Sequence, residues 1–267
     1  MQRESSAEAP LRAEDRGPVR WLVLDRPGRR NALSLRLLLE LQAALAKAEA
    51  DGAVRTICLS GAGDQAFCAG ADLAAAVGDP GEGPLAAHEG RRAYAALLAA
   101  LPRLGKPVVA CVNGAALAGG LGLVCACDLA VAADDARFGT PEIEVGLFPY
   151  MALAPLARVV GRRAALELAL TGRRIDAQEA LRIGIVNRVV ARAALPAAAQ
   201  ELCEELAAKS PAVLRLGKRA FYATEDLPYE AQLEALAAQL SVNAAADDAR
   251  EGVAAFLEKR APRFTGR

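Results

Sequence analysis

The sequence predicts an α/β fold followed by a helical C-terminal region. Short apolar runs with the length of buried strands alternate with longer amphipathic segments between residues 19 and 190. From residue 195 onward the pattern becomes helical, and nothing strand-like follows. Such alternation is typical of α/β domains. The chain has 267 residues, 54% of them hydrophobic, which is enough for one large core.

Apolar runs and turn residues place the elements of this core. Ser34 is placed to cap a helix that continues to residue 50, where Asp51-Gly52 ends it. Strands are expected at residues 19–24, 54–60, 108–112, 129–133 and 184–190. The expected division is a flexible tail at residues 1–16, a core at 17–194 and a helical region at 195–267.

Helices in the second half of the chain are expected to begin at capping residues. Asp176 and Glu179 have capping-box spacing, Ser210-Pro211 starts a helix, and Asp247 starts the last one. Apolar stripes along residues 195–267 indicate an element for oligomerisation. A helical layer packed on its own core is the alternative.

Composition excludes several function classes. Lys plus Arg and Asp plus Glu both number 32, so the formal net charge is zero and we expect no nucleic-acid partner. His88 is the only histidine, which excludes a site that needs two histidine ligands. The six cysteines form no C-x-x-C pair, so buried thiols are expected. With no signal-peptide pattern and no membrane-spanning run, we expect a cytoplasmic protein.

Two glycine-rich stretches are candidates for a ligand site, Ala69-Gly70-Ala71-Asp72 and Gly119-Gly120-Leu121-Gly122. Neither fits a dinucleotide or P-loop motif. The second opens an apolar helical run, and free N–H groups at a helix N-terminus favour negative charge. Two such groups directed at one point make an oxyanion hole. Simple tight packing is the alternative interpretation.

The acidic candidates near these stretches are Asp72, Asp128, Glu142 and Glu144. Glu142 follows Pro141 in a largely apolar segment, where desolvation raises a carboxyl pKa and makes the group a general base. A solvated loop glutamate is the other interpretation. Asp128 follows an apolar run and is expected to cap or hydrogen-bond locally.

Six segments together carry a resemblance to a known family. They occur in the order RRNALS, AFCAGADL, KPVVACVNGAALAGGLGLVCACD, RFGTPEIEVGLFP, LTGRRIDAQEALRIGIVNRVV and DDAREGVAAFLEKRAPRF. In this order and spacing the chain resembles the enoyl-CoA hydratase/isomerase (crotonase) superfamily from about Val19 to Phe264. The resemblance implies a crotonase-like spiral of ββα turns, with C-terminal helices that build a homo-trimer or hexamer.

The resemblance also implies an acyl-CoA thioester substrate. Ala71 and Gly119 match the positions whose backbone N–H groups form the oxyanion hole. Substrate contacts are implied for Arg30, Ala69, Asp72, Leu73 and Gly120. No metal and no cofactor are expected, since CoA is carried by the substrate, and no membrane partner is implied.

One departure from the family pattern decides the expected chemistry. Hydratases of this family use two glutamates; Glu142 matches the second, whereas the first aligns with Gly122. A site with Glu142 as its single base resembles that of the enoyl-CoA isomerases. A weak hydratase is the other outcome that the resemblance allows. An acyl-CoA-binding or assembly protein with little turnover is the alternative.

Two further expectations concern the neighbours of this base. Glu144 is a possible substitute for the missing glutamate, because residues two apart share a face of an extended segment; otherwise it is solvated. Gly122→Glu is expected to raise hydration if the pocket has room, and Tyr150 and Met151 are expected to reshape the acyl pocket.

Overall fold

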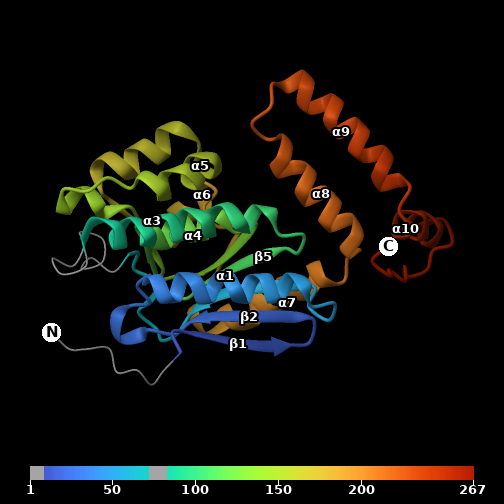
Figure 1. Cartoon of the computed structure of the whole chain (residues 1–267). Helices are drawn as coiled ribbons and strands as arrows, with labels where there is room; N and C mark the ends of the chain where they lie inside the picture. Colours follow the sequence, from blue (N-terminus) through green and yellow to red (C-terminus); the bar gives the residue numbers. More distant parts are fainter. Residues whose placement is uncertain (1–8, 72–82) are drawn as a thin grey trace.

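The computed structural model describes residues 9–71 and 83–267 and has the α/β architecture that the sequence predicts (Figure 1). The strands are β1 (Leu11–Arg16), β2 (Val19–Leu24), β3 (Thr56–Gly61), β4 (Ala66–Cys68), β5 (Val108–Val112), β6 (Ala115–Leu117), β7 (Leu129–Ala133), β8 (Arg137–Gly139), β9 (Arg174–Asp176) and β10 (Arg188–Val190). The helices are α1 (Leu35–Ala50), α3 (Gly83–Ala100), α4 (Gly119–Ala126), α5 (Tyr150–Thr171), α6 (Ala177–Arg182), α7 (Leu195–Ala207), α8 (Pro211–Thr224), α9 (Tyr229–Ala244) and α10 (Asp247–Leu257).

Short 3-10 helices connect some of these elements. They are η1 (Pro27–Arg29), η2 (Leu101–Arg103), η3 (Pro141–Val145) and η4 (Arg192–Ala194). The strands form a sheet in the order β1-β2-β3-β5-β7-β10 and a smaller one in the order β4-β6-β8-β9. Pairing is parallel except between β1 and β2 and between β8 and β9. The chain thus alternates between two sheets as it advances.

Both faces of the larger sheet are covered, as its nearly continuous apolar strands require. Alternate residues of β3 divide between the two faces. Ile57 and Leu59 join the main core with α1, whereas Cys58 joins a second cluster that α7 closes with Leu202 and Cys203. All six cysteines are buried and unpaired, as the sequence predicts.

The expected flexible tail is wrong for residues 11–16. These residues form β1, which pairs with β2 from Leu11↔Leu24 to Arg16↔Val19. β1 is mostly exposed, so its sequence lacks the apolar run that marked the other strands. The antiparallel hydrogen bonds to β2 hold it, and these are invisible to a pattern of hydrophobicity. The division at residue 195 stays a prediction.

Helix starts follow the capping residues that the sequence predicts. Ser34 accepts a hydrogen bond from Leu37 N–H and Asp176 from Glu179 N–H, at the starts of α1 and α6. Ser210 accepts from Val213 N–H at the start of α8. These caps satisfy N–H groups that have no partner within their own helix.

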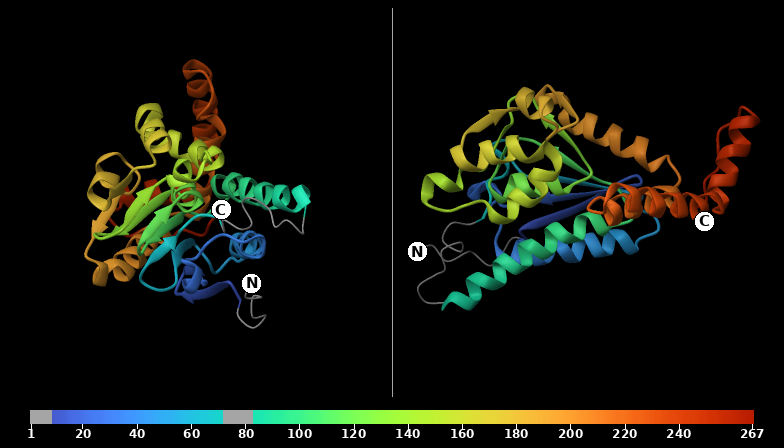
Figure 2. Two further views of the ribbon diagram at one scale, coloured as in Figure 1. Left: turned by 90° about the vertical axis from the view of Figure 1, so that its left-hand side faces the viewer. Right: turned by 90° about the horizontal axis from the view of Figure 1, so that it is seen from above.

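The C-terminal helices extend to one side of the body (Figures 1 and 2). A polar cluster fastens α8 to the core. Lys218 Nζ donates to Asp128 Oδ2 at 2.6 Å and to the carbonyl oxygens of Leu101 and Lys106, and Tyr222 donates to Asp128 Oδ1 at 2.9 Å. Asp128 also accepts from Val108 N–H. The expectation of a local hydrogen bond is wrong, because these partners lie 20 to 94 residues away and Asp128 instead joins distant elements.

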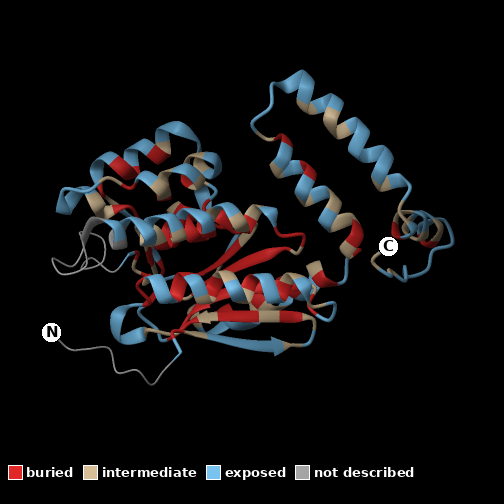
Figure 3. Ribbon diagram, in the orientation of Figure 1, coloured by how far each residue is buried: buried red, intermediate tan, exposed pale blue. Residues whose placement is uncertain are grey.

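The helices beyond α8 bury little of their own apolar surface. No residue of α9 is buried, and the helix is almost entirely exposed in Figure 3. Large apolar side chains on α9 and α10 lie in solvent, including Leu240 at 68% and Phe256 at 82% exposure. A helical layer packed on its own core would cover these side chains. Among the described residues, no helix combines the length and apolar character needed to cross a lipid bilayer.

Removing the cation from the α8 anchor tests its contribution to stability. Lys218→Met leaves Asp128, whose side chain is only 17% exposed, without its ammonium partner. We expect the unfolding free energy in urea to fall by about 3–5 kcal/mol. Arg188→Met breaks an exposed ion pair with Glu205 and serves as the control, with an expected loss below about 1 kcal/mol. Equal losses of unfolding free energy in the two variants would show that the buried ion pair stabilises the fold no more than the exposed one.

Candidate functional site

The two glycine-rich stretches meet at the ends of neighbouring strands. β4 and β6 are parallel partners, so their carboxyl ends lie at the same edge of the smaller sheet. Ala71 lies just beyond the end of β4, and Gly119 lies just beyond the end of β6 as the first residue of α4. The structure therefore brings together the two residues that the sequence offers as oxyanion-hole donors.

Glycines allow the backbones to approach closely here. A Cβ on Gly120 would lie 2.1 Å from the carbonyl oxygen of Cys68 in β4. Gly70 has φ of +99°, and a Cβ on it would lie 2.6 Å from the Cβ of Ala118 and 3.2 Å from the backbone nitrogen of Gly119. Side chains at either position would push α4 away from β4. Tight packing is therefore present at these glycines, at the same place as the two candidate donors.

Neither the N–H group of Ala71 nor that of Gly119 donates to a backbone carbonyl within residues 9–71 and 83–267. Ala118 precedes Gly119 with φ of +53°, a sparsely populated conformation for a residue with a side chain, and its carbonyl accepts from both Leu121 and Gly122. Such strain persists only where the surroundings determine it.

A neighbouring segment at residues 30–33 supports the first donor. Ala69 N–H donates to the Arg30 carbonyl and Leu33 N–H donates to the Gly70 carbonyl. Asn31 is fully buried; its Nδ2 donates to the carbonyls of Ala62 and Ala66, and its Oδ1 accepts from Arg26 N–H. Sequence reasoning quoted Asn31 only within a motif and missed this role. The side chain of Arg30 is exposed beside the site.

Glu142 lies in η3, which follows β8. Leu117 of β6 pairs with Gly139 of β8, and Ala118 N–H donates to the Gly139 carbonyl, so η3 begins next to the start of α4. Among the described residues, the buried Oε2 of Glu142 has no hydrogen-bond partner. Burial raises the pKa of this carboxyl group, and a hydrogen bond with its own backbone opposes the rise only in part. A carboxylate with a raised pKa and one oxygen without a partner is suited to take up a proton.

Glu144 is not a substitute base. The segment Pro141–Val145 is a 3-10 helix and not an extended strand, so residues two apart do not share a face. Glu144 is exposed and lies 3.6 Å from Arg174 in an ion pair. The alternative of a solvated glutamate is the correct one.

The space beside Gly122 is already filled. A Cβ on Gly122 would lie 2.4 Å from the hydroxyl oxygen of Tyr94 and 2.9 Å from the Cα of Ala152 in α5. The room that Gly122→Glu would need in order to raise hydration is therefore absent unless Tyr94 and α5 move. Ala152 is the α5 residue that meets Gly122, whereas Tyr150 is 79% exposed and contacts Phe148 edge-on.

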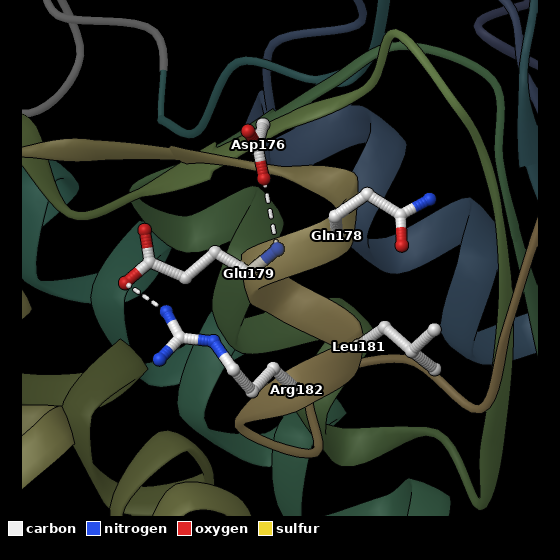
Figure 4. A pocket seen from close by; sticks show the side chains of 5 residues that line it. All are labelled: Asp176, Gln178, Glu179, Leu181 and Arg182. Atoms are coloured by element: carbon white, nitrogen blue, oxygen red, sulfur yellow. Dashed lines mark hydrogen bonds and ion pairs between the residues drawn. The ribbon is translucent and has the colours of Figure 1, made fainter.

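Two of the candidate substrate contacts and one surface hollow lie apart from the residues described above. Asp72 and Leu73 lie outside the described residues. Figure 4 shows a hollow around α6 that contains none of the candidate residues. Its acidic groups serve the local structure, since Asp176 caps the helix and Glu179 pairs with Arg182 and Arg173.

Comparison with known proteins agrees with this geometry. The family model described as enoyl-CoA hydratase/isomerase matches residues 15–267. The chain belongs to this family. Carnitinyl-CoA dehydratase of Proteus mirabilis is 36% identical, with 96% of this chain and 98% of that protein covered.

Solved structures show the same fold for the whole chain. A Bacillus anthracis enoyl-CoA hydratase has a TM-score of 0.91 at 33% identity, covering 97% of this chain and 100% of that one. Human enoyl-CoA hydratase domain-containing protein 3 has a TM-score of 0.91 at 34% identity, covering 96% and 100%. The crotonase fold predicted from the six segments is confirmed, and the chain is an acyl-CoA enzyme of the enoyl-CoA hydratase/isomerase family.

The buried carboxyl of Glu142 makes stability depend on pH. Because its native pKa is raised, the native state binds the proton more tightly than the unfolded chain, so stability falls as pH rises from the unfolded pKa through the native one. Glu142→Gln is thus expected to be more stable than the wild type at neutral pH, with the difference closing below about pH 4. Urea unfolding across this range measures it, with Glu144→Gln as the control. A difference independent of pH would contradict the assignment.

Proposed function

We propose that this enzyme stabilises a thioester enolate in an oxyanion hole formed by the backbone N–H groups of Ala71 and Gly119, with Glu142 as the single carboxylate acid/base. The observation that carries the proposal is the buried, unpartnered Oε2 of Glu142 next to the start of α4. Two preorganised donors are worth several kcal/mol to a developing oxyanion, roughly 3 kcal/mol each.

The reaction that these groups support best is isomerisation of an enoyl-CoA. The thioester oxygen of a 3-enoyl-CoA accepts hydrogen bonds from the two N–H groups, which makes the C2 protons more acidic. Glu142 takes a proton from C2, and the electron pair moves onto the thioester oxygen as the dienolate forms. The same group returns the proton to C4, which leaves the 2-enoyl-CoA and regenerates the carboxylate.

Hydration of a 2-enoyl-CoA would be weak at this site. It needs one group to position and deprotonate water and a source of the proton for C2. Gly122 has no side chain for either task, and Glu144 faces solvent. The site therefore lacks the second carboxylate that efficient hydration would need.

Binding of the CoA part is assigned to the segments that flank the first donor. The Arg30 side chain is exposed, and the Arg30 carbonyl is tied to Ala69, so a cation stands beside the thioester site. Gly120 brings α4 against β4 and leaves the substrate channel without a side chain at this position. Asp72 and Leu73 are proposed to extend the channel. No metal and no separate cofactor take part in the proposed reaction.

Parallel assays on a 2-enoyl-CoA and a 3-enoyl-CoA test the function. Isomerisation of the 3-enoyl-CoA is expected to exceed hydration, and Glu142→Gln is expected to lower it by about 10²–10⁴-fold. Incorporation of deuterium at C2 in D₂O follows the proton step directly. Glu144→Gln, two residues along the same 3-10 helix, is the matched control and should retain activity. Efficient hydration that is indifferent to Glu142→Gln would overturn the assignment.

We also propose that the chain forms a homo-trimer or a hexamer through the helical C-terminal region. The support is the apolar surface that α9 and α10 leave exposed, including Leu233, Leu240 and Phe256. Contiguous apolar surface of this kind is typical of contact between subunits.

The oligomer is expected to be seen by size-exclusion chromatography with light scattering at micromolar concentration. A mass of three or six chains of 27.7 kDa is expected. Leu240→Glu together with Phe256→Glu should shift the mass toward the monomer, because burying unpaired charges in an interface is costly. Leu39→Glu, on the exposed face of α1, is the control. A monodisperse wild-type monomer would contradict the proposal.

A further inference from the structure

Tyr94 of α3 has its hydroxyl group at the start of α4. Its side chain is buried, at 7% exposure, and the hydroxyl donates to the carbonyl oxygen of Gly119 at 2.7 Å. A Cβ on Gly119 would lie 3.4 Å from both the Cζ and the hydroxyl oxygen of Tyr94. The end of the tyrosine ring therefore rests on the same glycine whose N–H is the second donor. Sequence reasoning did not single out this residue.

We propose that Tyr94 is a positioning residue of the oxyanion hole, whose hydroxyl fixes the orientation of Gly119 and takes the space that a side chain at position 122 would need. This inference rests on the proposed function, since it assigns the Gly119 N–H to the thioester oxygen. It adds a residue from α3 to a site otherwise built from β4, α4 and η3.

The backbone at Gly119 needs an external restraint because glycine has no Cβ to limit its dihedral angles. The Ala118 carbonyl, on the peptide that carries the Gly119 N–H, is already held by Leu121 and Gly122. The bond from Tyr94 holds the next peptide. The two restraints together fix both sides of Gly119, so the N–H points in one direction before substrate arrives. Preorganised donors are those that stabilise a developing charge most.

The hydroxyl stays a donor under working conditions. Burial raises the pKa of Tyr94 well above its ordinary range, and the nearby Cys68, Cys125 and Glu142 act in the same direction. The group is thus neutral and keeps the proton that it shares with the Gly119 carbonyl. α3 is held in turn by Gln42 of α1, whose Nε2 donates to the Ala93 carbonyl at 2.8 Å.

Tyr94 and a side chain at position 122 exclude each other. The distance from the hydroxyl oxygen to a Cβ on Gly122 would be 2.4 Å, well inside van der Waals contact. The loss of the first family glutamate is therefore coupled to the tyrosine on α3. The hydroxyl group of Tyr94 occupies the space in which the family's first glutamate would lie. It is a neutral group that already donates to the Gly119 carbonyl.

Enolisation of bound acetoacetyl-CoA reads out the oxyanion hole without turnover, since the enolate has its own near-ultraviolet absorbance. Tyr94→Phe keeps the ring and removes the hydroxyl; the ratio of enolate to keto form is expected to fall by roughly tenfold, with total affinity little changed. For a 3-enoyl-CoA the loss should appear in kcat and leave KM within about twofold. Tyr222→Phe is the control. It removes another half-buried hydroxyl group, which donates to Asp128, and it should leave the ratio unchanged.

A double-mutant cycle tests the coupling to position 122. Gly122→Ala pushes against the hydroxyl, so the enolate ratio should fall about tenfold in the wild-type background and less than about twofold in the Tyr94→Phe background. Contact with Ala152 is common to both backgrounds and cancels. If Gly122→Ala does not fold because of its contact with Ala152, the enolate ratio of Tyr94→Phe alone still tests the bond.

Two results separate this inference from the proposed function. Enolate formation in the wild type that is unchanged by Tyr94→Phe and by Gly122→Ala would overturn the role of Tyr94 and leave the oxyanion hole intact. No enolate in the wild type, despite binding of acetoacetyl-CoA, would overturn both. Additive effects in the cycle would overturn the coupling between Tyr94 and Gly122.

Discussion

The close approach of two backbones, at the end of β4 and the start of α4, is the constraint on which the site depends. Gly120 lies against the carbonyl of Cys68, and Gly70 lies against Ala118. No larger residue fits either position without moving a strand or a helix, and the two N–H donors are carried by the residues next to these contacts. The same packing that closes the core therefore sets the geometry of the proposed oxyanion hole.

Keeping this geometry has a cost that the surrounding structure offsets. Ala118 holds a backbone conformation that disfavours a side chain, and the buried Oε2 of Glu142 lacks a partner. Both lower stability, by about 1–3 kcal/mol for each such feature. The fully buried Asn31 ties its own segment to Ala62 and Ala66, at the two ends of the turn between β3 and β4, and the Asp128 cluster fastens α8 to the core. The fold tolerates the strain at Ala118 because the polar groups of these surrounding networks have hydrogen-bond partners.

The sequence predicted the parts of the fold that a single strand or helix expresses on its own. Val19–Leu24 and the cap at Ser34 appear where the patterns place them, because a short run of apolar residues and an unsatisfied helix N-terminus are local properties. β1 was missed because its stability comes from pairing and not from apolar residues. Glu144 was offered as a possible second base on the assumption of an extended segment, whereas Pro141 starts a 3-10 helix there.

The site was predicted only as far as its motifs reach along the chain. Motifs in the sequence point to Ala71 and Gly119 in glycine-rich stretches and to Glu142 in a Pro-Glu step. The resemblance to the family assigns them their roles. Tyr94 lies in a helix with no motif, and its importance depends on a distance across the fold to Gly122. The one available signal was the missing glutamate itself, because space left by an absent side chain in a well-packed core is filled by another residue.

The only tryptophan has a consequence for optical work on this protein. Trp21 lies in the cluster that α7 closes, with its Nε1 donating to Gln200 at 2.7 Å and the guanidinium of Arg16 stacked 4.2 Å from the ring centroid. Cys68, Tyr94 and Leu121, which surround the site, belong to the other cluster. Indole emission therefore reports the seating of α7 and β1 on the sheet. Because the indole and the site belong to different clusters, a change of emission on addition of acyl-CoA would signal movement of the frame and not contact with the ligand.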